Sequence, residues 1–163
     1  MERSEMSIFD SWNINASGMT AQRFRMDTIA ENLANANTTR TLDGEPYRRK
    51  VVTFAEKETR TPFSRVLRNS ISRFSGPTYR DNWTSKGVKV DRVSEDTWTQ
   101  MNIVYDPSHP DADENGYVTY PNVNTITEMT NLIDAQNAYT ANATAFEASK
   151  AIATRGLNLG GGA

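Results

Sequence analysis

Residues 7–37 read SIFDSWNINASGMTAQRFRMDTIAENLANAN. This stretch has no proline and a single glycine, Gly18, so no proline interrupts a long helix. Large apolar side chains recur every seven residues, at Trp12, Met19, Met26 and Leu33. This interval places side chains on one stripe of an α-helix, close to a heptad seam. The spacing predicts a helix over residues 7–37, with an imperfect heptad because Arg23 occupies a seam position.

The other end of the chain repeats this pattern. Leu132, Tyr139 and Phe146 are again seven residues apart, and Met129 is expected on the same face. Alanine, the best helix former, is frequent between residues 135 and 153. Three glycines from Gly160 onward then favour a helix stop. The pattern predicts a second helix over residues 123–160, with residues 1–6 and 161–163 as flexible ends.

Short β-branched and aromatic runs separated by turn residues lie between these helices. The candidate strands are residues 51–54, 88–90, 92–93, 102–105 and 117–120. Residues 58–86 show no clean period and are expected to be rich in loops. The fold class is therefore α+β: two long terminal helices form a coiled-coil-like pair, the discontinuous domain of residues 7–37 and 123–160. A small β-rich domain, residues 38–122, is inserted between them.

An isolated helix is marginal in water, and most helical stability in proteins comes from packing of an amphipathic face. The two terminal helices therefore need each other to bury their stripes. Further copies of the chain are expected to complete this burial. Helices at both ends of the chain that become fully covered only in an assembly are typical of a filament subunit.

The composition argues against most catalytic and metal sites. The chain of 163 residues has no cysteine, which removes disulfides, thiol nucleophiles and cysteine-ligated zinc. Its single histidine, His109, argues against a Ser-His-Asp triad and against a site with several histidine ligands. Because the remaining carboxylates lie in no recognisable catalytic context, no enzyme activity and no cofactor are expected.

The middle of the chain is basic. Between Arg40 and Arg92 there are thirteen Lys and Arg against six Asp and Glu, a net charge of +7. The whole chain carries −2, which leaves −9 for the two ends. Basic residues interleaved with aromatic ones can bind nucleic acid; here they are Arg48, Arg49, Lys50, Arg60, Arg65, Arg68, Arg73 and Arg80, with Phe63, Phe74, Tyr79 and Trp83. No nucleic-acid fold signature accompanies them, so a solvated face or an acidic neighbour is the preferred interpretation.

An acidic loop offers a second alternative. Asp111, Asp113 and Asn115 match the start of an EF-hand calcium loop, with Gly116 at the glycine position. The glutamate required at its twelfth position is replaced by Asn122. The competing interpretation is an acidic turn before the strand at residues 117–120, in which Gly116 adopts a positive φ. We prefer this turn to a calcium-binding module.

Membrane insertion is not expected. The mean hydropathy is −0.66, and runs of apolar residues fall far short of the roughly 20 needed to cross a bilayer. Trp12 and the two methionines could anchor an interfacial helix, but its polar face offers only Arg23 and Arg25. Residues 1–6, MERSEM, lack the apolar region of a cleaved secretory signal. Export, if it occurs, is expected to need no cleaved leader.

Residues 32–38 read NLANANT, which resembles a signature of the flagellar rod and hook proteins, the axial protein family. Its alanines let neighbouring helices approach closely. Asn35 and Asn37 offer side-chain amides and are expected to allow the left-handed turn that ends the helix. Asparagines in both helices are expected either to bond across closely packed helices or simply to face water.

Three further segments resemble the proximal-rod branch of that family. They are SGMTAQR at residues 17–23, YRRKVV at 47–52 and VYDPSHPDADENGYVTYPNVN at 104–124. The similarity covers about residues 6–160, is weak over 58–86, and departs from the family pattern at 94–98.

The resemblance implies a structural subunit of the proximal rod, the part of the basal-body drive shaft that lies in the periplasm. It implies assembly with copies of itself, with other rod proteins and with membrane-ring and export-gate components, guided by a rod-capping muramidase. Export would use the flagellar type III apparatus. The residues expected to carry packing and assembly are Trp12, Met19, Met26, Leu33, Asn35, Asn37, Met129, Leu132, Tyr139 and Phe146.

Overall fold

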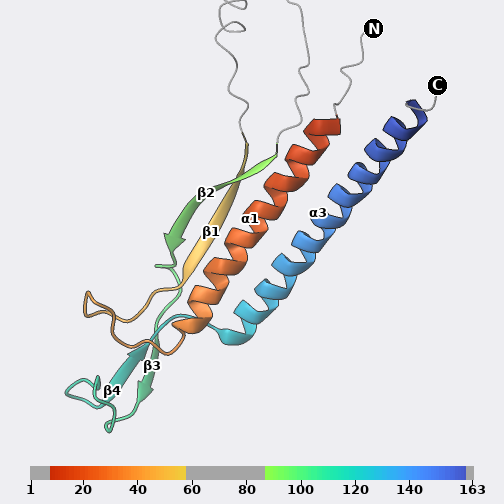
Figure 1. The fold of residues 1–163 in the computed structure, drawn as a ribbon. Helices are drawn as coiled ribbons and strands as arrows, with labels where there is room; N and C mark the ends of the chain where they lie inside the picture. Colours follow the sequence, from red (N-terminus) through yellow and green to blue (C-terminus); the bar gives the residue numbers. More distant parts are fainter. Residues whose placement is uncertain (1–7, 58–86, 161–163) are drawn as a thin grey trace, which may run out of the picture.

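A computed structural model describes residues 8–57 and 87–160, so the expectations for residues 1–6, 58–86 and 161–163 lie outside the described part. Two long helices dominate it: α1 (Ile8–Ala34) and α3 (Thr125–Gly160). They run antiparallel, side by side (Figure 1). Both predicted helices are confirmed, and the α+β class is confirmed by four short strands between them.

The register of the helix pair is constant along its length. Ser11 contacts Ser149 through their hydroxyl groups at 3.4 Å, and the amide of Asn32 donates to Glu128 at 3.0 Å. Gly18 lies against the side chain of Asn142. In each of these contacts the two residue numbers add to 160. The helices therefore pack without a slip in register over this span.

The seam between the helices mixes small and polar residues with a few large apolar and aromatic ones. Buried or half-buried positions in α3 recur at alternating steps of four and three residues, as in a heptad; they are Glu128, Leu132, Ala135, Tyr139, Asn142, Phe146, Ser149 and Ala153. Leu132, Tyr139 and Phe146 therefore lie where expected. The expectation for Met129 is wrong, because Met129 is 56% exposed and Glu128 takes the seam position.

Gly18 allows the close approach of the two helices. A Cβ at this position would lie 2.8 Å from the amide oxygen of Asn142 and 2.9 Å from its Cγ. We expect Gly18→Ala to push Asn142 aside and to lower the thermal midpoint, although alanine favours helix by about 1 kcal/mol over glycine. Gly156→Ala is the matched control, since nothing lies within 4 Å of its added methyl. In thermal melts followed by circular dichroism, the control should be neutral or stabilised; a Gly18→Ala protein that behaves the same would contradict the close contact.

The strands form two separate antiparallel pairs. Strand β1 (Lys50–Glu56) pairs with β2 (Val88–Glu95), and β3 (Asn102–Tyr105) pairs with β4 (Tyr117–Tyr120). The strands confirm the predicted runs, except that the runs at residues 88–90 and 92–93 belong to one strand, β2. A register shift after Thr53 leaves one extra residue, Asp91, in β2. The division of the chain into a helical core and an inserted β domain stays a prediction.

The β1–β2 pair packs against α1, on the side of that helix away from α3 (Figure 1). Ser17 makes one of the connections: its hydroxyl donates to the carbonyl of Ile14 and accepts from the backbone N–H of Val88 at 3.1 Å. A Cβ on Gly87 would collide with the same hydroxyl. Glycine at position 87 thus lets the start of β2 lie directly on the helix.

Side chains and local turns define the helix ends. The side chain of Asn124 caps α3, because its oxygen accepts from the backbone N–H groups of Ile126 and Thr127. The expected left-handed turn after α1 is wrong: within residues 8–57 and 87–160, positive φ is confined to Gly44 and Gly116. Successive turns end α1 instead, with the Ala36 N–H donating to Leu33 and the Thr38 N–H to Asn35. The value of 82° at Gly116 confirms the turn expected there.

Candidate functional site: a polar clamp and an exposed helix face

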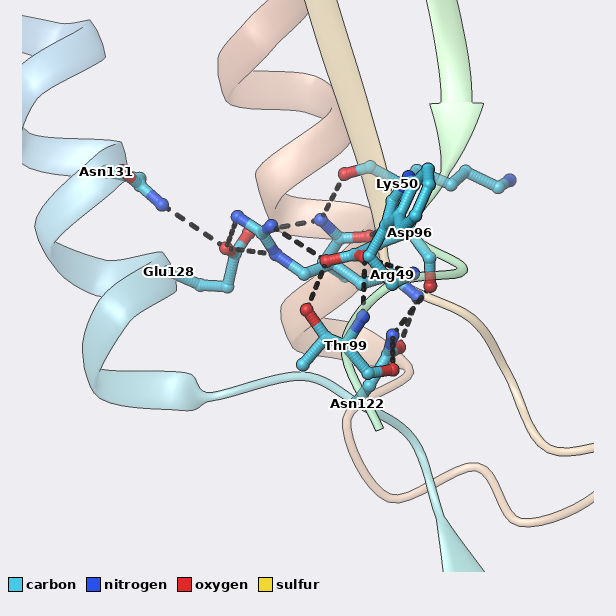
Figure 2. A network of polar contacts seen from close by, with 9 residues as sticks. Arg49, Lys50, Asp96, Thr99, Asn122, Glu128 and Asn131 are labelled. Atoms are coloured by element: carbon cyan, nitrogen blue, oxygen red, sulfur yellow. Dashed lines mark hydrogen bonds and ion pairs between the residues drawn. The ribbon is translucent and has the colours of Figure 1, made fainter. Parts of the chain in front are cut away.

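Among the fully buried side chains of the described part, the largest are those of Glu128, Val118 and Asn32. Two of these three are polar. Both polar side chains belong to a network near the end of α1 and the beginning of α3, here called the polar clamp and shown in Figure 2. The polar clamp consists of Asn32, Tyr47, Arg49, Lys50, Asp96, Thr99, Asn122, Glu128 and Asn131.

Asn32 lies at the centre of the clamp and is 1% exposed. Its amide nitrogen donates to the carbonyl of Lys50 at 2.9 Å and to Glu128 at 3.0 Å. Its oxygen accepts from the backbone N–H of Lys50 and the hydroxyl of Tyr47, both at 2.9 Å. An asparagine side chain has two donor hydrogens and two acceptor lone pairs, and all four are used here. One side chain therefore joins α1, β1 and α3.

Glu128 is a buried carboxylate in the first turn of α3. One of its oxygens accepts from the Arg49 Nε at 2.9 Å and from the Arg49 terminal nitrogen at 2.7 Å. Asn131 donates to the same oxygen, and Asn32 donates to the other. A buried charge is tolerated only when it is paired and its lone pairs are satisfied. Arg49 thus holds the start of α3 against the start of β1, as Figure 2 shows.

Asn122 and Asp96 extend the clamp to the other strands. The oxygen of Asn122 accepts from the backbone N–H of Arg49, and its amide donates to the carbonyls of Asp96 and Thr99. Asp96 also lies 3.5 Å from the Arg49 guanidinium. Hydrogen bonds from the backbone and hydroxyl of Thr99 hold the pKa of Asp96 below its usual range. The segment after β2 is therefore fixed to the same arginine as α3.

The clamp brings together three of the sequence motifs. Asn32 comes from NLANANT, Arg49 from YRRKVV and Asn122 from the long run that ends in YPNVN. The polar groups of the clamp satisfy one another's hydrogen bonds. The clamp can therefore hold α1, β1 and α3 together rigidly. It presents no unpaired base or nucleophile to a substrate.

Tyr47 makes the clamp sensitive to alkali. Burial, and then the negative charges of Glu31, Glu128 and Glu95, raise the pKa of Tyr47 from 10.0 to about 12. Because the folded protein holds this proton more tightly than the unfolded chain, the stabilisation is complete below pH 10 and is lost as pH rises toward 12. We expect Tyr47→Phe to be less stable at neutral pH but to lose less stability between pH 9 and 11. Urea unfolding at several pH values measures this, and parallel curves for the two proteins would contradict it.

The predicted assembly residues lie in several environments. Trp12 contacts Phe146 across the helix pair, with ring centroids 5.8 Å apart. Met19, Met26 and Leu33 are half-buried, one residue after the seam positions of Gly18, Arg25 and Asn32. Asn35 donates to the carbonyl of Glu31 in its own helix, and Asn37 is exposed. Of the expected asparagine bonds between helices, the one from Asn32 is found; those of Asn131 and Asn142 stay within α3.

The outer face of α3 carries apolar side chains that the described part of the chain leaves largely exposed. Ile126 is 77% exposed, Met129 56% and Ile133 57%. Ile152, Leu157 and Leu159 are also exposed near the end of this helix. Large apolar patches on a folded chain commonly mark contacts with partners. The role of all these residues in assembly stays a prediction.

Three residues of the predicted basic cluster lie inside the described part, and each is paired within the chain. Arg48 lies 3.8 Å from Glu45, Lys50 pairs with Glu31, and Arg49 pairs within the clamp. The other members of the predicted basic cluster, from Arg60 to Arg80, lie outside the described residues. Intramolecular pairing therefore accounts for the three basic residues at 48–50 without nucleic acid.

The acidic loop is a structured turn. Asp113 accepts from the backbone N–H groups of Asn115 and Tyr117, while Asp111 accepts from the hydroxyl of Thr39. Within the described ranges, no group of three or more His, Asp or Glu side chains is placed to hold a metal ion. His109 stays in the loop, where its Nδ1 accepts from the backbone N–H of Asp111. Neither α1 nor α3 is both long and apolar enough to span a membrane.

Comparison with known proteins first defines a class. Residues 13–40 match the family model "Flagella basal body rod protein". Residues 114–159 match the model "Flagellar basal body rod FlgEFG protein C-terminal". These two segments contain most of α1, most of α3 and strand β4. The class is that of flagellar rod proteins.

Curated relatives define the family. The chain is 43% identical to the flagellar basal-body rod protein FlgC of Bacillus subtilis, over 95% of this chain and 99% of the relative. It is 39% identical to FlgC of Borreliella burgdorferi, over 90% and 93%, and 33% identical to FlgC of Salmonella typhimurium, over 95% and 99%. The chain belongs to the FlgC family of flagellar basal-body rod proteins. It is a structural subunit of the rod, and the family is not one of enzymes.

The sequence did not single out the residues that hold the clamp together. Glu128 was missed because it looks like an ordinary acidic residue in the first turn of a helix. Arg49 was taken as part of a basic cluster, and Asn122 only as the residue in place of a calcium ligand. A usable signal existed, since Asn32, Arg49 and Asn122 each lie inside a motif that carried the family resemblance.

Proposed function

We propose that this chain polymerises through the outward faces of α1 and α3 to form part of the proximal rod, the drive shaft that transmits torque through the periplasm. The observation that carries this proposal is the exposed apolar face of α3, where Ile126, Met129 and Ile133 lie in water in the single chain. Covering such side chains in an assembly contributes about 1.5–3 kcal/mol for each one fully buried. A helix pair that fully buries few large apolar side chains of its own gains much of its burial from neighbours.

The proposed partners are copies of this chain, other rod proteins, and the membrane-ring and export-gate components at the base of the rod. A rod-capping muramidase would guide assembly, and the chain would leave the cytoplasm through the flagellar type III apparatus without a cleaved signal. The family membership supports these partners and this route. In the assembled shaft, the polar clamp would pass a load on the β-strands directly to both helices.

Electron cryo-microscopy of basal bodies tests the proposal. Basal bodies are isolated from cells that lack this chain and from the same cells complemented with it. The complemented cells should swim and show density for α1 and α3 between the membrane ring and the distal rod. Cells without the chain should not swim and should lack a complete rod. A complete rod and normal swimming in the absence of the chain would overturn the proposal.

A further inference from the structure

A groove lies on the side of α1 away from α3. It has a volume of about 470 Å³, and small α1 side chains line one wall, among them Ala16, Ser17 and Thr20. Val88 and Val90 of β2 line the other wall. Ala16 and Thr20 lie about half a turn from Gly18, which faces α3, so the groove and the seam are on opposite sides of the helix.

Two lysines give this groove a positive rim. Lys57 and Lys89 both line it and both are exposed. Neither ammonium group has an acidic partner among the residues that the structure describes. Among the described residues that line the groove, none is acidic. The groove is therefore apolar within and basic at its edge.

The outer face of α3 has the complementary character. Ile126, Met129 and Ile133 form an exposed stripe, here called the α3 stripe. Asp134 follows immediately, is exposed, and has no ion-pair partner in the described part of the chain. Between the buried Glu128 and Glu147 it is the single charged residue of the helix. The stripe is thus apolar with an acidic border.

We propose that the α3 stripe of one copy of this chain docks in the groove between α1 and β2 of the next copy. The proposal rests on the self-assembly proposed above and names the two surfaces that carry it. Apolar side chains enter a groove lined by small residues, and Asp134 meets the basic rim. Contacts between unlike surfaces repeat from copy to copy without closing, which generates an open filament when the rotation does not close a ring.

The positions of the two surfaces along the helices fix how far successive copies are displaced along the helix axis. Because facing residues of α1 and α3 have numbers that add to 160, the groove at residues 13–21 is level with residues 139–147 of α3. The α3 stripe lies about thirteen residues nearer the start of that helix. At about 1.5 Å per residue, docking therefore shifts the next copy by roughly 20 Å along the helix axis. The α3 of the docked copy runs antiparallel to the α1 that lines the groove, as does the α3 of the copy that provides the groove.

Cysteine cross-linking tests the contact directly, because the natural chain has no cysteine. Thr20→Cys and Ile133→Cys are made in separate copies, co-expressed in cells that lack the natural chain, and treated in isolated basal bodies with a short bismaleimide. The mixed pair should give a cross-linked dimer, and either variant alone should not. Thr20→Cys mixed with Ile152→Cys is the matched control and should give none.

Charge reversal provides a second measurement. Lys57→Glu combined with Lys89→Glu, or Asp134→Lys alone, should lower the cross-linked fraction about tenfold, a change that corresponds to roughly 1.4 kcal/mol. Combining both sets of substitutions should restore the cross-linked fraction, because the charges then attract again with reversed signs. Lys150→Glu is the control and should have no effect. Rods that contain the chain but give no mixed cross-link would overturn the inference alone. Basal bodies that contain no copy of the chain would overturn the proposed function as well.

Discussion

Replacing Asn32 with alanine is expected to lower the free energy of unfolding by about 3 kcal/mol or more. The substitution removes four hydrogen bonds and leaves buried groups of Tyr47, Lys50 and Glu128 without this partner. Each buried polar group left unsatisfied costs roughly 1–3 kcal/mol, and water that enters the cavity offsets part of this. Guanidinium unfolding followed by circular dichroism measures the loss.

Asn35→Ala is the matched control for this experiment. Asn35 belongs to the same motif, but its amide donates to a carbonyl of its own helix and is exposed to water. The control should lose less than about 1 kcal/mol. Asn32→Asp is a second variant, because it keeps the volume but removes both donor hydrogens. If Asn32→Ala and Asn35→Ala lower the free energy of unfolding equally, the hydrogen bonds of Asn32 in the clamp do not stabilise the fold more than an exposed hydrogen bond does.

Replacing Arg49 with methionine is expected to be at least as damaging. The long apolar side chain keeps much of the volume but leaves the carboxylate of Glu128, 1% exposed, without its cation. Breaking a buried ion pair by removing one partner costs about 3–5 kcal/mol, because the remaining charge stays buried and uncompensated. The free energy of unfolding should fall by this amount, and complemented cells should swim poorly.

The neighbouring arginine supplies the control. Arg48→Met removes an exposed pair with Glu45, and such pairs contribute about 0–1 kcal/mol. A second variant, Arg49→Met with Glu128→Gln, should recover part of the loss, since the neutral amide is cheaper to bury than an unpaired carboxylate. If Arg49→Met and Arg48→Met unfold at the same guanidinium concentration, Glu128 is not buried against Arg49 as described.

These two experiments bear on how the subunit carries load. In the described part of the chain, Asn32 and Arg49 connect α1, α3, β1 and the segment after β4 through a few short bonds. A variant that folds but lacks this connection would let the helices and the strands move separately under torque. Swimming speed, measured beside stability, separates a loss of stiffness from a loss of folded protein.

Much of the architecture follows from local pattern. The recurrence of Trp12, Met19, Met26 and Leu33 predicted α1, and that of Leu132, Tyr139 and Phe146 predicted α3. The β-branched runs predicted the strands because side chains of that shape suit an extended backbone. Motifs such as NLANANT carried the family resemblance. Local propensity and periodicity are properties of neighbours along the chain, so they can be read without the fold.

The tertiary structure alone decided which faces meet and which polar groups are buried. The seam centres on Gly18 and Asn32, one residue before Met19 and Leu33, because backbones approach most closely where side chains are small or can bond across the gap. Asn32 and Glu128 are 96 positions apart, and the spacing of neither reveals the other. The sequence by itself thus determined the helices, the strands and the family. The clamp depends on distant groups losing water together, which only the folded chain can determine.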